Sequence, residues 1–441
     1  MRGACTPFEG KKITLLGLGL LGRGVGDAEF LAKCNARLVV TDVKTREQLQ
    51  DPVARLEKYP NIEFHLGGHR AEDFSGIDLV IKAAGVPLDS PEVAEAKKNG
   101  VQVAMSTAFF AKSAMEMGAT VVGVTGTRGK STTAQMIVEV LKAAGKNVLL
   151  GGNVRGVSTL AMLPDVSNDT VAVLELDSWQ LQGFGDMKIS PHIAVFTNLM
   201  PDHLNYYGGD MEKYFSDKAN LFRYQKPGDF LFVGKTVLEK ISAAQPPVAP
   251  RVLQPIPDDW KLKILGEHNR ENASLAAAAL RALGCSEKEI RDGLERFEGV
   301  EGRLQFVREV NGAKIYNDNN ATTPEATIAA LEALAKNITL IIGGSEKGLD
   351  LTALVASIRE HASRVIILTH EKYEGSARLA GEFKKVGVAF QEADSLQKAV
   401  DIAMRETTQG VVLFSPAFAS FGMFKNEYER NDEFLRIVRA L

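Results

Sequence analysis

The sequence predicts an α/β protein of three domains. Its 441 residues are enough for two or three separate hydrophobic cores. Short apolar runs alternate with amphipathic segments along the chain, which is typical of parallel strands joined by helices. Several of these runs end in glycine-rich turns, at residues 17–22, 126–129 and 343–344. Because ligands bind at the carboxyl ends of the strands in open α/β sheets, we expect the functional residues in these turns.

Composition excludes several classes of function. Hydrophobic residues make up 45% of the chain and charged residues 24%, which is ordinary for a soluble globular protein. A net charge of −3 argues against nucleic-acid binding. No apolar stretch approaches membrane-spanning length and the first residues lack a signal-peptide core, so we expect a cytoplasmic protein with no membrane partner. The three cysteines, Cys5, Cys34 and Cys285, lie far apart, which suits a reducing compartment and offers no metal-ligand spacing.

The first domain is expected over residues 1–109 as a Rossmann-like fold. A strand at 13–16 leads into Gly17-Leu18-Gly19-Leu20-Leu21-Gly22 and a helix, and the next strand ends at Asp42. This spacing fits a dinucleotide-binding fingerprint and predicts a pyrophosphate close to the backbone, with a hydroxyl partner near Asp42. A UDP-sugar offers the same features as NAD, and a purely structural turn is the alternative. A later loop at the same sheet edge contains Gly85.

The second domain, expected over residues 110–299, is organised around a phosphate-binding loop. The apolar run 121–124 predicts a buried strand, which is followed by Gly126-Thr127-Arg128-Gly129-Lys130-Ser131-Thr132 and a helix. Glycine turns direct backbone N–H groups at an anion, and the helix dipole adds to this attraction. Lys130 would reach the outer phosphates of a nucleotide, and Ser131 would hold Mg²⁺. Val124 replaces the first glycine of the strict Walker pattern, so an ordinary βα turn is the alternative.

Polar residues follow the next strands at the same edge of this P-loop ATPase-like parallel sheet. Glu175 ends an apolar run, where a carboxylate is a natural Mg²⁺ ligand. His203, in Pro-Asp-His, is either a ligand or a satisfied loop histidine. Lys218 would be a surface lysine from its pattern alone. Asn269 and Asn272 share one helix face, where they would cap the helix or read a purine edge.

The third domain, expected over residues 300–441, is again Rossmann-like. Strands are expected at 313–316, 339–342, 365–368 and 411–414. Thr323 and Pro324 have the cap and first-position chemistry of a helix start. Lys347 and Ser420 lie in loops after strands, where they would hold a small anionic substrate or form solvated turns.

Together these residues resemble the Mur ligase family of amino-acid ligases. The motifs that carry the resemblance, in chain order, are residues 125–132, Glu175 with Ser178 and Gln180, Asp202-His203, His268-Asn269 with Asn272, Arg303, and Asn317-Asp318. They span nearly the whole chain in the order found in the family. Within the family, the turn at 17–22 and the stretch 415–420 resemble the branch that adds glutamate to UDP-N-acetylmuramoyl-L-alanine.

The resemblance implies an ATP-dependent carboxylate–amine ligase that works through an acyl phosphate. It would add glutamate, expected as the D isomer, to UDP-N-acetylmuramoyl-L-alanine in peptidoglycan precursor synthesis. It would thereby serve cell-wall biogenesis, cell shape and cell division. The expected cofactors are ATP and two Mg²⁺ ions, and the protein would act as a cytoplasmic monomer.

The resemblance also implies a role for each matching position. ATP would contact Gly126, Thr127, Arg128, Gly129, Lys130, Ser131, Thr132, Asn269, Asn272, Arg303 and Asp318. The UDP-substrate would contact Leu20, Leu21, Asp42, Gly85, Asn153 and Ser178, and the amino acid would contact Thr322, Lys347, Ser420 and Phe421. The metal ligands would be Ser131, Glu175, His203 and a carbamylated Lys218. The catalytic set would be Lys130, Glu175, His203, Lys218 and Arg303.

Three positions depart from the family pattern. Asp177 stands where this branch usually has Ser, and Gly302 stands where His normally precedes the Arg. Asn320 replaces a lysine next to the expected amino-acid site, which leaves the identity and hand of the amino acid open. The rival hypotheses are a related ligase for L-glutamate or another amino acid, an NAD-dependent oxidoreductase resting on residues 17–22 and Asp42, and a non-catalytic nucleotide-binding subunit.

Overall fold

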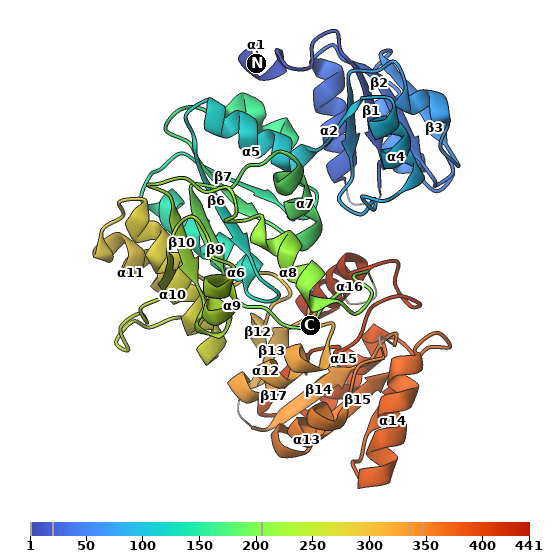
Figure 1. Ribbon diagram of the computed structural model, residues 1–441. Coiled ribbons are helices and arrows are strands. Elements are labelled where there is room, and N and C mark those ends of the chain that lie inside the picture. Colours follow the sequence, from blue (N-terminus) through green and yellow to red (C-terminus); the bar gives the residue numbers. More distant parts are fainter. Residues whose placement is uncertain (1, 20–21, 204–205, 335, 347) are drawn as a thin grey trace. The chain divides into compact units, whose positions relative to one another are not determined.

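The chain folds into three β-sheets with helices packed around them (Figure 1). The computed structural model describes residues 2–19, 22–203, 206–334, 336–346 and 348–441. One compact unit, Met1–Ile256 with Glu271–Leu294, contains the first two sheets. A second unit, Pro257–Arg270 with Glu295–Leu441, contains the third. The predicted α/β class is therefore confirmed. The boundary expected at residue 109 stays a prediction, and α5 (Ser106–Glu116) runs across it.

The first sheet has five parallel strands in the order β3-β2-β1-β4-β5. The strands are β1 (Lys12–Leu16), β2 (Arg37–Asp42), β3 (Ile62–Leu66), β4 (Leu79–Lys82) and β5 (Gln102–Met105). The accompanying helices are α1 (Arg2–Cys5), α2 (Arg23–Lys33), α3 (Gln50–Leu56), η1 (Ala71–Phe74) and α4 (Pro91–Lys98). The two predicted strands, β1 and β2, lie with β4 at the centre of the sheet, and β1 and β4 are apolar because both their faces are covered. The outer strands β3 and β5 carry polar residues, and the sequence pattern did not reveal them.

The second sheet has six parallel strands in the order β11-β10-β9-β6-β8-β7. They are β6 (Thr120–Thr125), β7 (Val148–Gly152), β8 (Val171–Glu175), β9 (Ile193–Phe196), β10 (Phe230–Val233) and β11 (Pro250–Val252). The helices are α6 (Lys130–Ala143), η2 (Leu160–Asp165), α7 (Ser178–Asp186), α8 (Met211–Ala219), η3 (Lys235–Val237), α9 (Leu238–Ala243), α10 (Glu267–Ala282) and α11 (Glu287–Arg296). β11 is an edge strand that the sequence pattern did not reveal. Pro250 begins this edge strand, where a missing N–H is tolerated.

The third sheet is mixed, in the order β12-β13-β17-β14-β15-β16. Its strands are β12 (Gln305–Val310), β13 (Ala313–Asn317), β14 (Ile338–Ile342), β15 (Ala362–Leu368), β16 (Gln391–Ala393) and β17 (Gly410–Phe414). Its helices are α12 (Pro324–Leu334), α13 (Thr352–His361), α14 (Glu374–Val386), α15 (Leu396–Glu406) and α16 (Glu427–Arg439). The predicted helix start at Pro324 is confirmed. β12 is antiparallel to β13, and the Asn311-Gly312 turn between them has two positive φ angles, as a tight hairpin requires.

Alternate residues of β14 belong to two separate buried clusters. Leu340 and Ile342 pack in one cluster and Ile341 in the other. Since neighbouring side chains of a strand point to opposite faces, the third sheet is buried on both sides. This explains why every residue of β14 is buried.

The cysteines differ from the sequence-based expectation. Cys5 and Cys34 form a disulfide, whereas Cys285 is free and buried. The separation of 29 residues carried no signal for this pairing. The two are brought together because apolar residues near them pack, with Phe8 and Phe30 in edge contact at 5.7 Å between ring centroids.

None of the helices in the described residues has both the length and the apolar character needed to cross a bilayer.

Candidate active site

The turn between β6 and α6 is built so that only glycine fits at two positions. Gly126 has φ of 140° and Gly129 has φ of 82°, a region that side chains rarely enter. A Cβ on Gly126 would also collide with the hydroxyl of Thr197, and one on Gly129 would collide with the amide of Asn272. The turn is thus held with its backbone close to neighbouring polar groups, as a phosphate-binding loop requires.

The loop is fixed to the end of the neighbouring strand β9. The backbone N–H of Arg128 donates to Oδ1 of Asn198 at 2.9 Å, and that of Thr127 donates to the Asn198 carbonyl at 2.9 Å. The Thr197 hydroxyl donates to the carbonyl of Arg128. These bonds set the conformation of the loop before any ligand arrives.

Two lysine side chains converge on one carbonyl of this loop. Nζ of Lys130 lies 3.1 Å from the Gly126 oxygen and 3.0 Å from the Thr127 oxygen. Nζ of Lys218 lies 2.9 Å from the same Gly126 oxygen. The surface position that the pattern alone suggested for Lys218 is wrong, because its side chain is buried. Burial, and then the charge of Lys130, lower the pKa of Lys218 well below its usual range.

Ser131 and Glu175 supply the donor types that Mg²⁺ prefers. Ser131 lies in the first turn of α6. Glu175 ends β8, is mostly buried, and pairs in register with Val124 of β6. Among the described residues no group of three His, Cys, Asp or Glu side chains could hold a metal by itself. A hydroxyl and one carboxylate fit Mg²⁺ bound together with phosphate oxygens and water, which is its usual arrangement with nucleotides.

His203 lies on the loop after β9 with an unusual backbone. Its φ is 52°, and its ring lies 4.7 Å from that of Trp179 between centroids. Burial lowers the pKa of His203, although the charge of Asp202 partly opposes this shift. The neutral imidazole that burial favours is the form that ligates metals.

The two asparagines of α10 form hydrogen bonds with different parts of the structure. The Asn272 amide accepts a hydrogen bond from the Thr133 hydroxyl at 3.4 Å, beside Gly129 of the phosphate loop. Nδ2 of Asn269 donates to the Leu265 carbonyl at 2.7 Å, which is a local, end-of-helix interaction. Contact of either side chain with adenine stays a prediction.

Asp42 braces the first glycine turn from within the protein. Its Oδ2 accepts hydrogen bonds from the backbone N–H groups of Leu18 and Gly19, at 2.9 and 3.1 Å. The carboxylate is buried, so its position is explained without a ligand hydroxyl. Leu20 and Leu21, also expected at the UDP-substrate, lie outside the described residues.

Other residues expected at the UDP-substrate lie at the ends of strands in the same unit. Oδ1 of Asn153 accepts a hydrogen bond from Arg23 at 3.0 Å, and Gly85 is in the turn after β4. Ser178 is buried at the start of α7. Asp177, which departs from the family pattern, caps this helix by accepting from the Gln180 N–H at 2.7 Å.

In the second unit, Asp318 joins three loops. Its carboxylate accepts from the Ser415 hydroxyl at 2.8 Å and from the Leu304 N–H at 2.9 Å, next to Arg303. Thr322 follows on the same loop as Asp318. The other two departures from the family pattern touch each other, since the Asn320 N–H donates to the Gly302 carbonyl at 2.9 Å.

Ser420 and Phe421, which were also expected to contact the amino acid, lie on the loop after β17. The Ser420 carbonyl accepts from the Tyr373 hydroxyl at 3.2 Å, and the Phe421 side chain is exposed. Lys347 lies outside the described residues.

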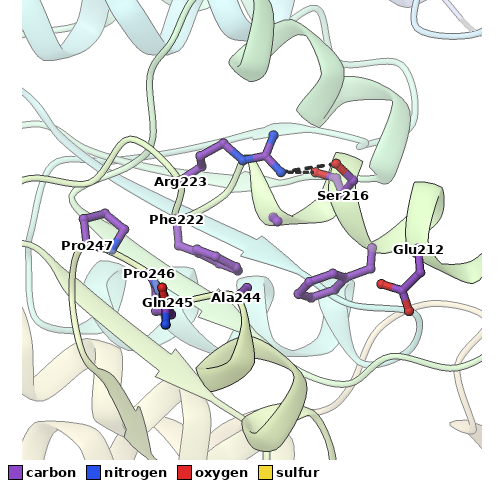
Figure 2. A pocket seen from close by; sticks show the side chains of 10 residues that line it. Glu212, Ser216, Phe222, Arg223, Ala244, Gln245, Pro246 and Pro247 are labelled. Atoms are coloured by element: carbon purple, nitrogen blue, oxygen red, sulfur yellow. Dashed lines mark hydrogen bonds between the residues drawn. The ribbon is translucent and has the colours of Figure 1, made fainter.

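A cavity of about 360 Å³ lies against the other side of α8 (Figure 2). Tyr214 and Lys218 of this helix contact the phosphate loop, whereas Phe215 and Ala219 line the cavity. None of the described candidate residues lines it.

Sequence reasoning missed one residue of the second unit, Arg430. Its side chain is fully buried and contacts the loops after β13 and β17. The signal was present, because Arg430 falls on the same helical face as the buried Phe434 and Ile437 of α16. A charge in an apolar stripe indicates either a buried partner or a function.

Three family models match the chain in order. Residues 11–105 match the N-terminal domain of MurD-like Mur ligases, residues 124–246 the Mur ligase middle domain, and residues 302–418 the Mur ligase glutamate ligase domain. The first match assigns the turn at 17–22 to a Mur ligase, which leaves the oxidoreductase hypothesis without support.

Curated relatives match over nearly the full length. A UDP-N-acetylmuramoylalanine--D-glutamate ligase from Roseiflexus sp. (strain RS-1) is 34% identical over 98% of this chain and 99% of its own. One of the same name from Koribacter versatilis is 31% identical over 98% of both chains.

Solved structures share the fold. The UDP-N-acetylmuramate-alanine ligase MurC of Thermotoga maritima superposes with a TM-score of 0.64 at 19% identity, over 98% of this chain and 99% of that one. A folylpolyglutamate synthase of Mycobacterium tuberculosis, complexed with ADP and AMPPCP, gives a TM-score of 0.56 at 16% identity over 71% and 93%. From the three family models and the full-length relatives, the chain belongs to the Mur ligase family.

Proposed function

We propose that this chain is an ATP-dependent ligase that joins D-glutamate to UDP-N-acetylmuramoyl-L-alanine in peptidoglycan precursor synthesis. The observation that carries the proposal is the match over 98% of the chain to relatives named for this activity. The glycine loop with Lys130 and Lys218 at one carbonyl supports the ATP-dependent half of the reaction.

The reaction would proceed in two steps. The alanine carboxylate attacks the γ-phosphorus of ATP, which forms an acyl phosphate and releases ADP. The glutamate amine then attacks the acyl carbon, and inorganic phosphate leaves from the tetrahedral intermediate as the amide forms. Lys130 and Arg303 would hold the phosphates and stabilise the negative charge that accumulates in the first step.

The cofactor arrangement is part of the proposal. Ser131 with Glu175 would hold one Mg²⁺, and His203 would hold a second with a carbamate on Lys218. The bound Mg²⁺ ions would supply positive charge against the phosphates. The burial of Lys218 beside the Gly126 carbonyl supports this role, because a carbamate there would lie at the phosphate loop.

The proposed substrate sites combine residues from different expected domains. The turn at 17–22 with Gly85, Asn153 and Ser178 would receive the UDP-substrate, and Asp42 would hold this turn in place. Thr322, Lys347, Ser420 and Phe421 would receive glutamate. Asn269, Asn272 and Asp318 would contact the nucleoside of ATP.

A second candidate function is a ligase of the same family for L-glutamate or another amino acid. It is favoured by Asn320, which stands where the family has a lysine. Phosphate release with UDP-N-acetylmuramoyl-L-alanine, Mg²⁺ and ATP would be measured across a panel of D- and L-amino acids. Release with D-glutamate alone supports the proposal, and preference for another amino acid supports the second candidate.

A further inference from the structure

Arg430 holds two loops of the second unit together through neutral groups. Its Nε donates to Oδ1 of Asn319 at 2.8 Å, and one Nη donates to the Asn319 carbonyl at 2.9 Å. The other Nη lies 3.3 Å from the carbonyl of Phe418. All five donors of a guanidinium lie in one plane, so these bonds fix the loop after β13 relative to the loop after β17.

This guanidinium is a buried charge on which the Glu427 carboxylate acts only from beyond ion-pair distance. Arg430 is 0% exposed, and among the described residues no carboxylate lies within ion-pair distance of it. Burial lowers the pKa of Arg430 to about 10, so the side chain remains cationic at neutral pH. A buried charge is costly unless it is paired, and such a residue is retained where its charge has a use.

The two loops that Arg430 joins are those expected to hold the incoming amino acid. Asn319 precedes Asn320 and Thr322, and Phe418 precedes Ser420 and Phe421. The Asn319 amide also donates to the Glu427 carbonyl at 2.9 Å, which ties the loop to the start of α16. The Arg430 guanidinium is therefore bonded to both loops that carry residues expected at the amino acid.

Asn320, the half-buried residue that follows Asn319 on this loop, is neutral. Asn320, which stands in place of a lysine, accepts a hydrogen bond from the Asn319 amide at 3.2 Å. An amino acid with two carboxylates would therefore meet no cation at residue 320. Salt screens the attraction between a substrate and a buried guanidinium much less than it screens the attraction to an exposed charge.

We propose that Arg430 is a positioning residue that fixes the two amino-acid loops and whose buried charge selects an amino acid with an anionic side chain. This inference rests on the proposed glutamate-ligase function. The guanidinium acts through Asn319 and through its field, because its own atoms have no access to the substrate.

The test neutralises the charge without removing the arginine. Asn319→Asp places a carboxylate at the atom that already accepts from Nε, so the guanidinium keeps its bond while its charge is paired. The readout is the ratio of kcat/KM for D-glutamate to kcat/KM for D-glutamine, its neutral isostere. We expect the ratio to fall about tenfold, on the order of the effect of one charge near the substrate at the effective dielectric of a protein. Loss of structure alone would lower both values equally.

Two further variants complete the test. Arg430→Lys keeps the charge but loses the planar set of donors that bonds to both loops. KM for glutamate should therefore rise, while the glutamate-to-glutamine ratio stays near that of the wild type. Arg436→Gln removes an exposed arginine of the same helix that pairs with Glu433. This control should change neither KM for glutamate nor the glutamate-to-glutamine ratio. KM for ATP should stay within about twofold in every variant, since none of the changes is at the phosphate loop.

The outcomes are separable. An unchanged ratio in Asn319→Asp, with a wild type active on glutamate, overturns the inference and leaves the proposed function intact. An equal fall for glutamate and glutamine also overturns it, because this indicates a purely structural role. A wild type that releases no phosphate with glutamate, but does so with a neutral amino acid, overturns both.

Discussion

At the scale of single residues, the phosphate loop concentrates positive charge. The amines of Lys130 and Lys218 bond to the same Gly126 carbonyl, and the charge of Lys130 disfavours the charged form of Lys218. Two amines in one place are stable together only where an anion or a loss of charge compensates them. ATP phosphates would supply the anion for Lys130, and carbamylation would reverse the charge of Lys218.

We expect Lys130→Ala to lower the rate of phosphate release by about 10²–10³-fold, the usual cost of removing one donor to a transition-state anion. Binding of UDP-N-acetylmuramoyl-L-alanine, measured by calorimetry, should change little. Lys142→Ala on the same helix is the control, because Lys142 is exposed and pairs with Glu139 at 3.3 Å. Equal loss of catalysis and acceptor binding would contradict this division of labour.

A carbamate on Lys218 would be visible by ¹³C NMR after incubation with labelled bicarbonate. We expect one carbamate signal in the wild type and in Lys213→Ala, whose lysine is exposed on the same helix. The signal should be absent in Lys218→Ala. A signal that survives in this variant, or is absent from active wild-type enzyme, would contradict the assignment.

At the scale of elements, the start of α6 depends on close packing against α10. Gly129 is the N-cap of α6, and the Asn272 side chain occupies the space that a Cβ on Gly129 would need. The glycine therefore provides both a backbone conformation and room for a neighbouring helix.

Gly129→Ala and Gly145→Ala separate these two effects. Both glycines have positive φ, but a Cβ on Gly145 meets nothing within 4 Å. Gly145→Ala should cost about 1–2 kcal/mol of unfolding free energy from backbone strain alone. Gly129→Ala should cost more and should also abolish ATP binding, measured by denaturant titration and calorimetry. Similar stability and retained ATP binding in both variants would show that the loop can relax.

Asp27 of α2 makes a pH-dependent contact with Ser158, which lies just before η2. Asp27 is buried and accepts a hydrogen bond from the Ser158 hydroxyl at 2.5 Å. Burial raises the pKa of Asp27 from 3.8 to about 6, because desolvation outweighs the hydrogen bonds that lower it. The folded state then binds the proton more tightly than the unfolded state, so this contribution to stability is lost as pH rises from about 4 to about 6.

Asp27→Asn should therefore flatten the pH dependence of stability across this range. The shift corresponds to roughly 3 kcal/mol at most, and the variant should be the more stable protein at pH 7. Unfolding free energies of both proteins from pH 4 to pH 7 would measure this. A difference between them that does not grow with pH would show that Asp27 keeps an ordinary pKa.

At the scale of the whole molecule, the sequence was sufficient where one local pattern determines one element. The strand, glycine turn and helix at 120–143 were predicted because the spacing of apolar residues, the glycines of the turn and the start of the helix all indicate the same elements. The edge strands β3 and β11 were missed. The sequence of β3 mixes polar and apolar residues, and β11 begins with a proline. The burial of Lys218 was also missed, because it depends on a loop distant in sequence, whereas the burial of Arg430 was missed although the apolar stripe of α16 indicated it.

The central claim is that ATP energises the muramoyl-alanine carboxylate for attack by D-glutamate. The most direct measurement is Mg²⁺-dependent phosphate release with UDP-N-acetylmuramoyl-L-alanine, run in parallel with D-glutamate, L-glutamate and no amino acid. We predict rapid release with D-glutamate, accompanied by an amide product of matching mass, and background release in the other two reactions. Release that does not depend on the acceptor, or that is equal for both isomers, would contradict the claim.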